Sequence, residues 1–394
     1  MVPAASTIDR SRWISRLRAF VATGPGALPP PEALFEPSAT QVGEVLLPLV
    51  ARRTLKRLLR ASLQPRSSAD VATEWARLIS ALLELPDSAL EALLVRPELA
   101  GLVARMEGEA EDERALLPWL GQVVVAAMVA HGGDLGPTRV ARSTPRTVCL
   151  PSAAVTGRLA SSGSEPVVVA VRAGRLLASD VSTWRATPRL AERIDVSTRR
   201  DAWLERTFPG VEYVAWLEER EREQFMRSLE EAVEVLHGVW PQAHQEVLAL
   251  LCWVVPLANL DSWYVPGVHG LIALSVRSER RQVRDLWHET SHHKLSRVLE
   301  LASASRAPDH RVFSPFAKGK EPVSSLLQSC WAFAREYELI ARLKASGYIE
   351  PRQIAREELK FRVLFEKGIP VLRREGQLTA LGDAVLTSIE ESVQ

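Results

Sequence analysis

Cysteine is scarce in this 394-residue chain, where Cys149, Cys252 and Cys330 are far apart and odd in number. They form no CxxC pair and no disulfide framework, so the sequence predicts a protein of a reducing compartment. Residues 1–18 lack the apolar core of a signal peptide, and no uninterrupted apolar run approaches the length that spans a membrane. We therefore expect a cytoplasmic protein without a membrane partner.

A charge excess of either sign is also missing. The 49 basic and 48 acidic residues leave a formal net charge of +1, which argues against a general nucleic-acid-binding role. With 46% hydrophobic and 25% charged residues, the composition is that of an ordinary globular protein. The length allows two domains, or one large domain with an accessory part. The oligomeric state is not predicted by the sequence.

Histidine is rare as well, with 8 residues in the chain, yet two of them stand four positions apart. His288 and His292 form a His-Glu-x-x-His motif with Glu289 after the first histidine. On a helix with 3.6 residues per turn, positions i and i+4 share one face, so both imidazoles can bind one divalent metal. We predict that His288 and His292 are metal ligands. The motif does not name the metal, because imidazole suits zinc, iron and copper.

The residues around the motif predict a buried helix. No glycine or proline occurs between Arg281 and Leu301. Apolar side chains cover a broad surface of this segment, at Leu286, Trp287, Leu295, Val298, Leu299 and Leu301. The segment 270–276 just before it is apolar except for Ser275 and predicts a strand. A metal-binding helix inside a protein is expected to have this pattern.

The chain as a whole predicts an α+β fold that is mainly α-helical. Residues 39–131 have amphipathic helical periodicity, which indicates a helical N-terminal region over 1–140. A second domain over 141–394 contains strands and the metal site. The β-branched runs 146–150 and 166–171 predict two of these strands. We further predict an irregular segment at 182–201, a helix over 241–255 and a loop at 303–322.

The third metal ligand and the role of Glu289 stay open at this stage. A peptidase-like site would take a carboxylate from Glu336 or Glu338, and His310 is a further option. In a peptidase Glu289 would activate a metal-bound water. In an oxygenase it would bind the metal or orient a ligand.

The C-terminal half resembles the HExxH-type peptide-modifying proteins. The resemblance rests on HExxHxKL from His288 to Leu295, then Phe313-Ser314-Pro315, Leu326-Leu327-Gln328 and Trp331-Ala332-Phe333. That family includes iron- and 2-oxoglutarate-dependent β-hydroxylases, which are dioxygenases acting on ribosomally made peptides in natural product biosynthesis. The resemblance implies Fe(II), 2-oxoglutarate and a peptide substrate for this chain, and it points to Gln328 as the third ligand.

The resemblance departs from the family pattern after the Ser-Pro pair. Ala317 and Glu321 stand where arginines are expected, and neither can grip a carboxylate as an arginine does. Lys318, Lys320 and Arg311 are the nearby candidates to hold the carboxylate of 2-oxoglutarate.

Lys294 is a fourth candidate for this role. It lies two residues past His292 and so points about 200° away from that ligand on a helix. We therefore expect Lys318 or Lys320, rather than Lys294, to supply the positive charge.

Two alternatives accompany the peptide β-hydroxylase. One is a zinc metallopeptidase with Glu289 as its general base. The other is a non-catalytic peptide-binding relative, which Ala317 and Glu321 favour.

Overall fold

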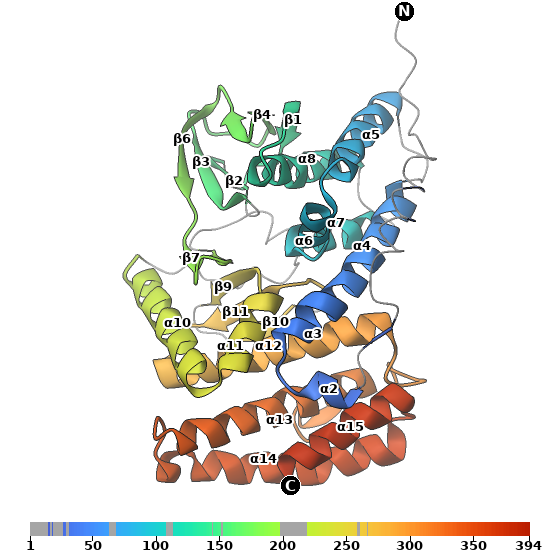
Figure 1. The fold of residues 1–394 in the computed structure, drawn as a ribbon, viewed down its shortest axis with the longest axis vertical. Helices are drawn as coiled ribbons and strands as arrows, with labels where there is room; N and C mark the ends of the chain where they lie inside the picture. Colours follow the sequence, from blue (N-terminus) through green and yellow to red (C-terminus); the bar gives the residue numbers. More distant parts are fainter. Residues whose placement is uncertain are drawn as a thin grey trace, which may run out of the picture.

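The computed structural model describes residues 31–62, 68–107, 113–143, 145–150, 153–197, 219–257, 261–265 and 267–394, together with Ser15, Arg18, Ala27 and Leu28. Helices predominate and the strands form small sheets (Figure 1). The predicted mainly helical α+β fold is confirmed.

Helices make up the described chain as far as Ala130. They are α2 (Pro31–Phe35), α3 (Ala39–Gln41), the π-helical η1 (Val42–Leu46), α4 (Leu47–Ser62), α5 (Ala69–Leu83), α6 (Asp87–Leu94), α7 (Pro97–Glu107) and α8 (Glu113–Ala130). Ser38 and Ser68 cap α3 and α5, since each hydroxyl accepts a hydrogen bond from a backbone N–H three residues on. Trp75 and Leu120 are fully or almost fully buried between these helices.

Helix α8 is long and apolar enough to cross a membrane when judged by length and composition alone. Most of it is buried inside the protein, including Leu120, Val124 and Val125. A core helix of this composition passes the same test.

Two three-stranded sheets follow. The first has the order β1-β4-β5 and the second β2-β3-β6. The strands are β1 (Leu135–Val140), β2 (Thr147–Leu150), β3 (Val155–Leu159), β4 (Val167–Arg172), β5 (Arg175–Leu177) and β6 (Val181–Ala186). The predicted strands 146–150 and 166–171 are confirmed as β2 and β4. The prediction of an irregular segment at 182–201 was wrong over 182–196, because β6 there pairs with β3 and two more strands follow.

The sheet next to the metal motif has five strands in the order β10-β11-β9-β8-β7. Its members are β7 (Arg189–Leu190), β8 (Ile194–Val196), β9 (Trp253–Leu257), β10 (Trp263–Tyr264) and β11 (Leu271–Ser275). Strands β8, β9 and β11 are parallel, whereas the end strand β10 is antiparallel to β11. All residues of β9 and β11 are buried, as central strands require.

Helices pack beneath this sheet (Figure 1). They are α10 (Glu219–Val239), α11 (Pro241–Leu250), α12 (Glu279–Leu301), α13 (Val323–Ala345), α14 (Pro351–Glu375) and α15 (Ala380–Val393). Helix α12 carries the His-Glu-x-x-His motif and lies between the sheet and α13. The strand predicted at 270–276 and the helix after it are confirmed as β11 and α12.

Two predictions in this region were wrong. The helix predicted over 241–255 ends at Leu250, because the β-branched residues after it pair with β11 as strand β9. The loop predicted at 303–322 contains a hairpin of β12 (Arg311–Ser314) and β13 (Gly319–Pro322).

The N-terminal helices are packed onto the helices of the metal motif. Helix α2 contacts α15, α3 contacts α11, and α4 contacts α12. The backbone N–H of Ser38 donates to Glu246 of α11, and the Glu36 carbonyl accepts from Lys294 of α12. One continuous cluster of buried apolar residues runs through both parts. The change from helix to strand falls between Ala130 and Leu135.

Candidate metal centre

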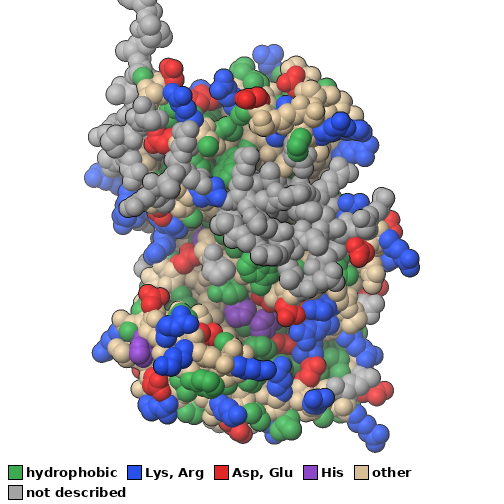
Figure 2. Space-filling view, turned by 180° about the vertical axis from the view of Figure 1, so that it is seen from behind, with side chains coloured by type: hydrophobic (Ala, Val, Ile, Leu, Met, Phe, Trp, Pro, Cys, Tyr) green, Lys and Arg blue, Asp and Glu red, His purple; other side chains and the backbone are tan. Residues whose placement is uncertain are grey.

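Helix α12 presents two histidines on one face at a partly open position. Between Gln282 and Leu295, His288 and His292 are the only residues that are not buried. Histidine side chains reach the surface in the middle of one face of the molecule, among charged and hydrophobic groups (Figure 2). The spacing of the motif therefore gives two neighbouring imidazoles within reach of solvent.

The two rings meet through the same nitrogen. Nε2 of His288 lies 3.2 Å from Nε2 of His292. Two nitrogens bound to one metal at 2.0–2.1 Å are roughly 2.9 Å apart at a right angle and roughly 3.4 Å apart at a tetrahedral angle. The observed separation lies within this interval, so the pair is spaced for a single metal ion.

The other nitrogen of each ring faces an oxygen of α13. Nδ1 of His288 lies 3.0 Å from Glu336 Oε2, and Nδ1 of His292 lies 3.3 Å from Gln328 Oε1. Each Nδ1–H can donate to its oxygen, which leaves a lone pair on each Nε2. Two lone pairs facing one another repel unless a proton or a metal ion lies between them. Burial and the neighbouring His288 lower the pKa of His292 well below its usual range, whereas, although burial opposes this, the hydrogen bond to Glu336 raises the pKa of His288. The donor set fits a divalent metal.

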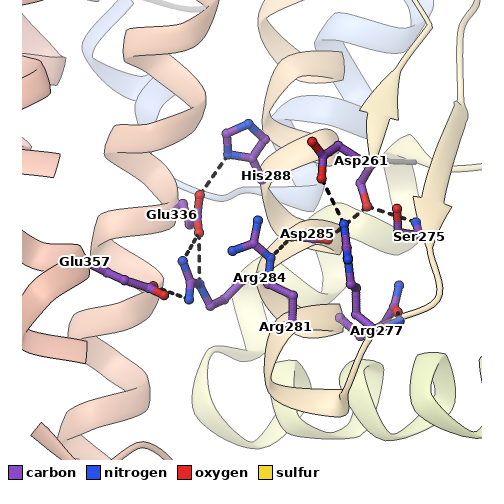
Figure 3. A network of polar contacts seen from close by, with 11 residues as sticks. Asp261, Ser275, Arg277, Arg281, Arg284, Asp285, His288, Glu336 and Glu357 are labelled. Carbon is purple, nitrogen blue, oxygen red and sulfur yellow. Dashed lines mark hydrogen bonds and ion pairs between the residues drawn. The ribbon is translucent and has the colours of Figure 1, made fainter. Parts of the chain in front are cut away.

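Arg284, one turn before His288, completes this arrangement (Figure 3). Its Nε and Nη2 donate to Glu336 Oε1 at 2.9 and 2.7 Å, and Nη1 is paired with Glu357 of α14. Although burial opposes the charge on Glu336, His288 and Arg284 lower its pKa to about 2. Glu336 is thus held as a carboxylate that accepts from His288 on one oxygen and from Arg284 on the other.

Glu289 lies on the side of α12 that faces strand β10. Its side chain is buried, and it accepts a hydrogen bond from the backbone of Tyr264. Burial, with Asp285 and Glu336 nearby, raises its pKa to about 7 against the opposing effect of His288. A carboxyl group that titrates near neutrality beside a metal is suited to accept and return a proton.

Strand β10 is tied to α12 by polar contacts. Ser262 donates to Asp285 Oδ2 at 2.9 Å and accepts from the backbone N–H of Ser275 at 3.0 Å. Arg281 is paired with Asp285, one turn along the helix (Figure 3). These contacts set the position of Tyr264 relative to the histidines.

Aromatic rings flank the two histidines. The Tyr264 ring is stacked on His292 with centroids 4.7 Å apart and planes at 14°. The Phe333 ring, from α13, meets His288 edge-on with centroids 4.6 Å apart. Both aromatic side chains are half-buried. Each histidine of the pair therefore has an aromatic neighbour, Tyr264 at His292 and Phe333 at His288.

The candidates for a third ligand do not point at the two Nε2 atoms. Among the described residues, no group of three or more His, Cys, Asp and Glu side chains is arranged to hold a metal. Gln328 and Glu336 contact Nδ1 of the histidines and not the nitrogens that meet. Glu338 is paired with Arg342 at 2.9 Å, and His310 is exposed beside the β12–β13 hairpin.

Lys294 faces away from the histidines, as its helical position predicts. It is fully buried, and its Nζ donates to Glu246 Oε2 and to the Glu36 carbonyl, each at 2.7 Å. Arg335 of α13 binds the other oxygen of Glu246 at 2.6 Å. This placement does not support Lys294 as a ligand of 2-oxoglutarate, because its charge is already paired between three helices.

The remaining basic candidates lie on the β12–β13 hairpin. Arg311, Lys318 and Lys320 are exposed, and Arg311 donates to the Lys320 carbonyl at 2.5 Å. Lys318 has a φ of +54°, so the left-handed turn residue is the lysine and not Gly319. The hairpin reaches the site through Phe316, whose ring is stacked on Phe333 at 5.1 Å.

Comparison with known proteins gives no assignment. No family model matches the chain, and no curated protein matches it.

Sequence reasoning brought the two histidines together correctly, but it named Gln328 and Glu336 as candidate metal ligands, whereas they contact the Nδ1 atoms of the histidines. It also missed the supporting arginine. Arg284 has no local signal except its place one turn before His288. His293, beside the motif, is buried and bonded to the Leu271 carbonyl, and this joins α12 to β11.

Proposed function

We propose that this chain is a metal-dependent enzyme that modifies a peptide, and that the modification is hydroxylation with Fe(II) and 2-oxoglutarate. The observation that carries the metal is the 3.2 Å separation of the Nε2 atoms of His288 and His292. Gln328 and Glu336 support it, because they hold the opposite nitrogens as donors. The nature of the reaction rests on the resemblance carried by HExxHxKL and the segments after it.

A peptide substrate is supported by the strand beside the site. Among the described strands, β10 is the end of its sheet and pairs with β11. An extended peptide can pair with the free side of such a strand through its backbone. Because Tyr264 of β10 is stacked on His292, a peptide held there would pass close to the metal position.

Iron held by two imidazoles would keep coordination positions open for a chelating cosubstrate. Iron and cosubstrate together would supply the oxidising chemistry. The role of the chain is to hold the imidazoles and to exclude competing ligands from their Nδ1 atoms. Arg284 cannot serve 2-oxoglutarate while it is paired with Glu336 and Glu357. The proposal therefore assigns the cosubstrate carboxylate to Lys318 or Lys320 of the hairpin.

A zinc metallopeptidase is the second candidate. It is favoured by Glu289, a buried carboxyl group next to His288 with a pKa raised to about 7 by burial. In that enzyme Glu289 would take the proton of a metal-bound water.

The test begins with metal analysis of protein purified without added metal. Activity is then assayed on a peptide library by mass spectrometry under four conditions, with or without oxygen and with or without 2-oxoglutarate. The proposal expects a mass gain of one oxygen that needs Fe(II), oxygen and 2-oxoglutarate. Cleavage that continues with zinc in the absence of oxygen would establish the peptidase instead. Protein that binds no metal would contradict both enzymes and leave the peptide-binding relative.

A further inference from the structure

We infer that the site selects a peptide whose residue next to the metal position has an aromatic or branched apolar side chain. Phe333 and Phe316 make the surface that recognises this side chain. The inference rests on the proposed function only in placing a peptide at the histidine pair.

The first observation is the surface beside His288. Among the described residues, the ring contacts of His288 are to His292 and Phe333. Phe333 is in turn stacked on Phe316 with planes at 17°. Both phenylalanines are half-buried.

The second observation is that this surface is firmly supported from behind. Phe361 and Phe365 of α14 are buried, and they pack against Phe333 and Phe316 respectively. A Cβ placed on Gly368 would lie 3.1 Å from Phe316, so the glycine leaves room for that ring. Movement of Phe333 would therefore disturb its contact with α14, and movement of Phe316 would disturb the contact of the hairpin with α14.

The third observation concerns the other histidine of the pair. Tyr264 is stacked on His292 and Phe333 meets His288, so the histidine pair has an aromatic ring at each of its two imidazoles. A charged side chain would lose hydration against these rings, which carry no charge that offsets the cost. An apolar side chain would bury its surface against Phe333 and Phe316, which stabilises the complex.

The experiment measures binding, not turnover. Blocked pentapeptides with Phe, Leu, Ser, Asp or Lys between pairs of glycines are titrated by calorimetry into the full chain, with and without Mn(II). Line broadening by Mn(II) in the peptide NMR spectrum reports which protons approach the metal position. In the titration without metal we expect Phe and Leu to bind at least about tenfold more tightly than Asp and Lys. With Mn(II), the central side chain of the Phe and Leu peptides should be broadened most.

Two variants separate recognition from folding. Phe333→Ala should lose the preference for Phe over Asp, whereas Phe333→Leu, which keeps an apolar surface, should retain most of it. Phe313→Ala is the matched control, because Phe313 is on the same hairpin as Phe316 but is 52% exposed. Equal binding of all five peptides, or equal effects of Phe333→Ala and Phe313→Ala, would overturn the inference. Absence of hydroxylation with the preference intact would overturn the proposed function alone.

Discussion

Glu336 Oε2 lies 3.0 Å from Nδ1 of His288, although 48 residues separate them in the chain. This contact joins α12 to α13 at the proposed metal position. It also fixes which nitrogen of His288 is free, because the nitrogen that donates to Glu336 cannot bind a metal. Gln328 contacts Nδ1 of His292 in the same way, which leaves Nε2 of that ring to bind a metal.

Removal of either histidine should abolish metal binding. His288→Ala and His292→Ala are expected to lose stoichiometric metal, since a lone imidazole holds a divalent ion weakly. Metal content by mass spectrometry and Co(II) absorption provide the measurement. His310→Ala, at an exposed histidine outside the pair, should keep full metal content. Full occupancy in His292→Ala would show that the motif is not a metal site.

Glu336→Gln should weaken the metal without unfolding the protein. The amide can still accept from His288, but it lacks the charge that makes the imidazole a better ligand. We expect a loss of about 10- to 100-fold in metal affinity. Glu338→Gln is the control, because Glu338 is on the same helix and is paired with Arg342. Equal metal affinities of the two variants would show that Glu336 does not contribute to metal binding.

Arg284 should act through Glu336. In Arg284→Met the carboxylate keeps His288 as a partner but is no longer held by two guanidinium nitrogens. Metal affinity should fall by roughly tenfold, and Arg284→Lys should restore little, since an ammonium cannot bind Glu336 and Glu357 in the same geometry. Competition with a chelator measures the affinity. Arg342→Met, at a half-exposed arginine of α13 that is paired with Glu338, should behave like the unmodified protein.

The buried group of Glu246, Lys294 and Arg335 should govern stability instead of ligand binding. Glu246→Gln leaves two buried cations without their carboxylate, and this should cost about 3–5 kcal/mol at pH 7. Glu107→Gln, which breaks the partly exposed pair with Arg57, should cost less than about 1 kcal/mol. Denaturant unfolding gives both values.

The pH dependence of this difference has a defined sign. Burial alone would raise the pKa of Glu246, but Arg335 and Lys294 outweigh it and the pKa is lowered in the folded protein. A lowered carboxyl pKa stabilises the fold above the unfolded value of about 4.3, and the contribution is lost as the pH falls below it. The difference in unfolding free energy between the original chain and Glu246→Gln should become smaller below about pH 4.3. A difference that stays constant there would contradict the assignment of Glu246 as an ionised partner.

The hairpin lysines should affect the cosubstrate and Lys294 should not. A Lys318→Ala, Lys320→Ala double variant is expected to lose affinity for 2-oxoglutarate, measured by titration of the Fe(II) protein without oxygen. Lys294→Ala should lower the unfolding temperature but leave that affinity unchanged in the folded fraction. If only Lys294→Ala lost affinity for 2-oxoglutarate, the carboxylate would bind near Lys294. That result would contradict the assignment to the hairpin lysines.

Local periodicity in the sequence determined the helix that carries the histidine pair. The i, i+4 spacing of His288 and His292, within a segment free of glycine and proline, predicts a helix that presents both imidazoles on one face, and α12 has that form. The same helical angle places Lys294 away from the face of the two histidines. The strand β11 before the helix was equally clear, because a buried strand is a short continuous apolar run.

Only the tertiary structure decided what surrounds the two histidines. Strand β9 exists because β8 and β11, which are distant in sequence, satisfy its backbone hydrogen bonds, so the local pattern there predicted a helix. The β12–β13 hairpin is a local pairing whose proline, glycine and charged residues predicted a loop. Arg284, Tyr264 and Phe333 belong to the site through the packing of α12 against α13 and β10. Spacing within one segment reports which side chains share a face. The groups that meet that face depend on how the elements pack, and no local pattern records this.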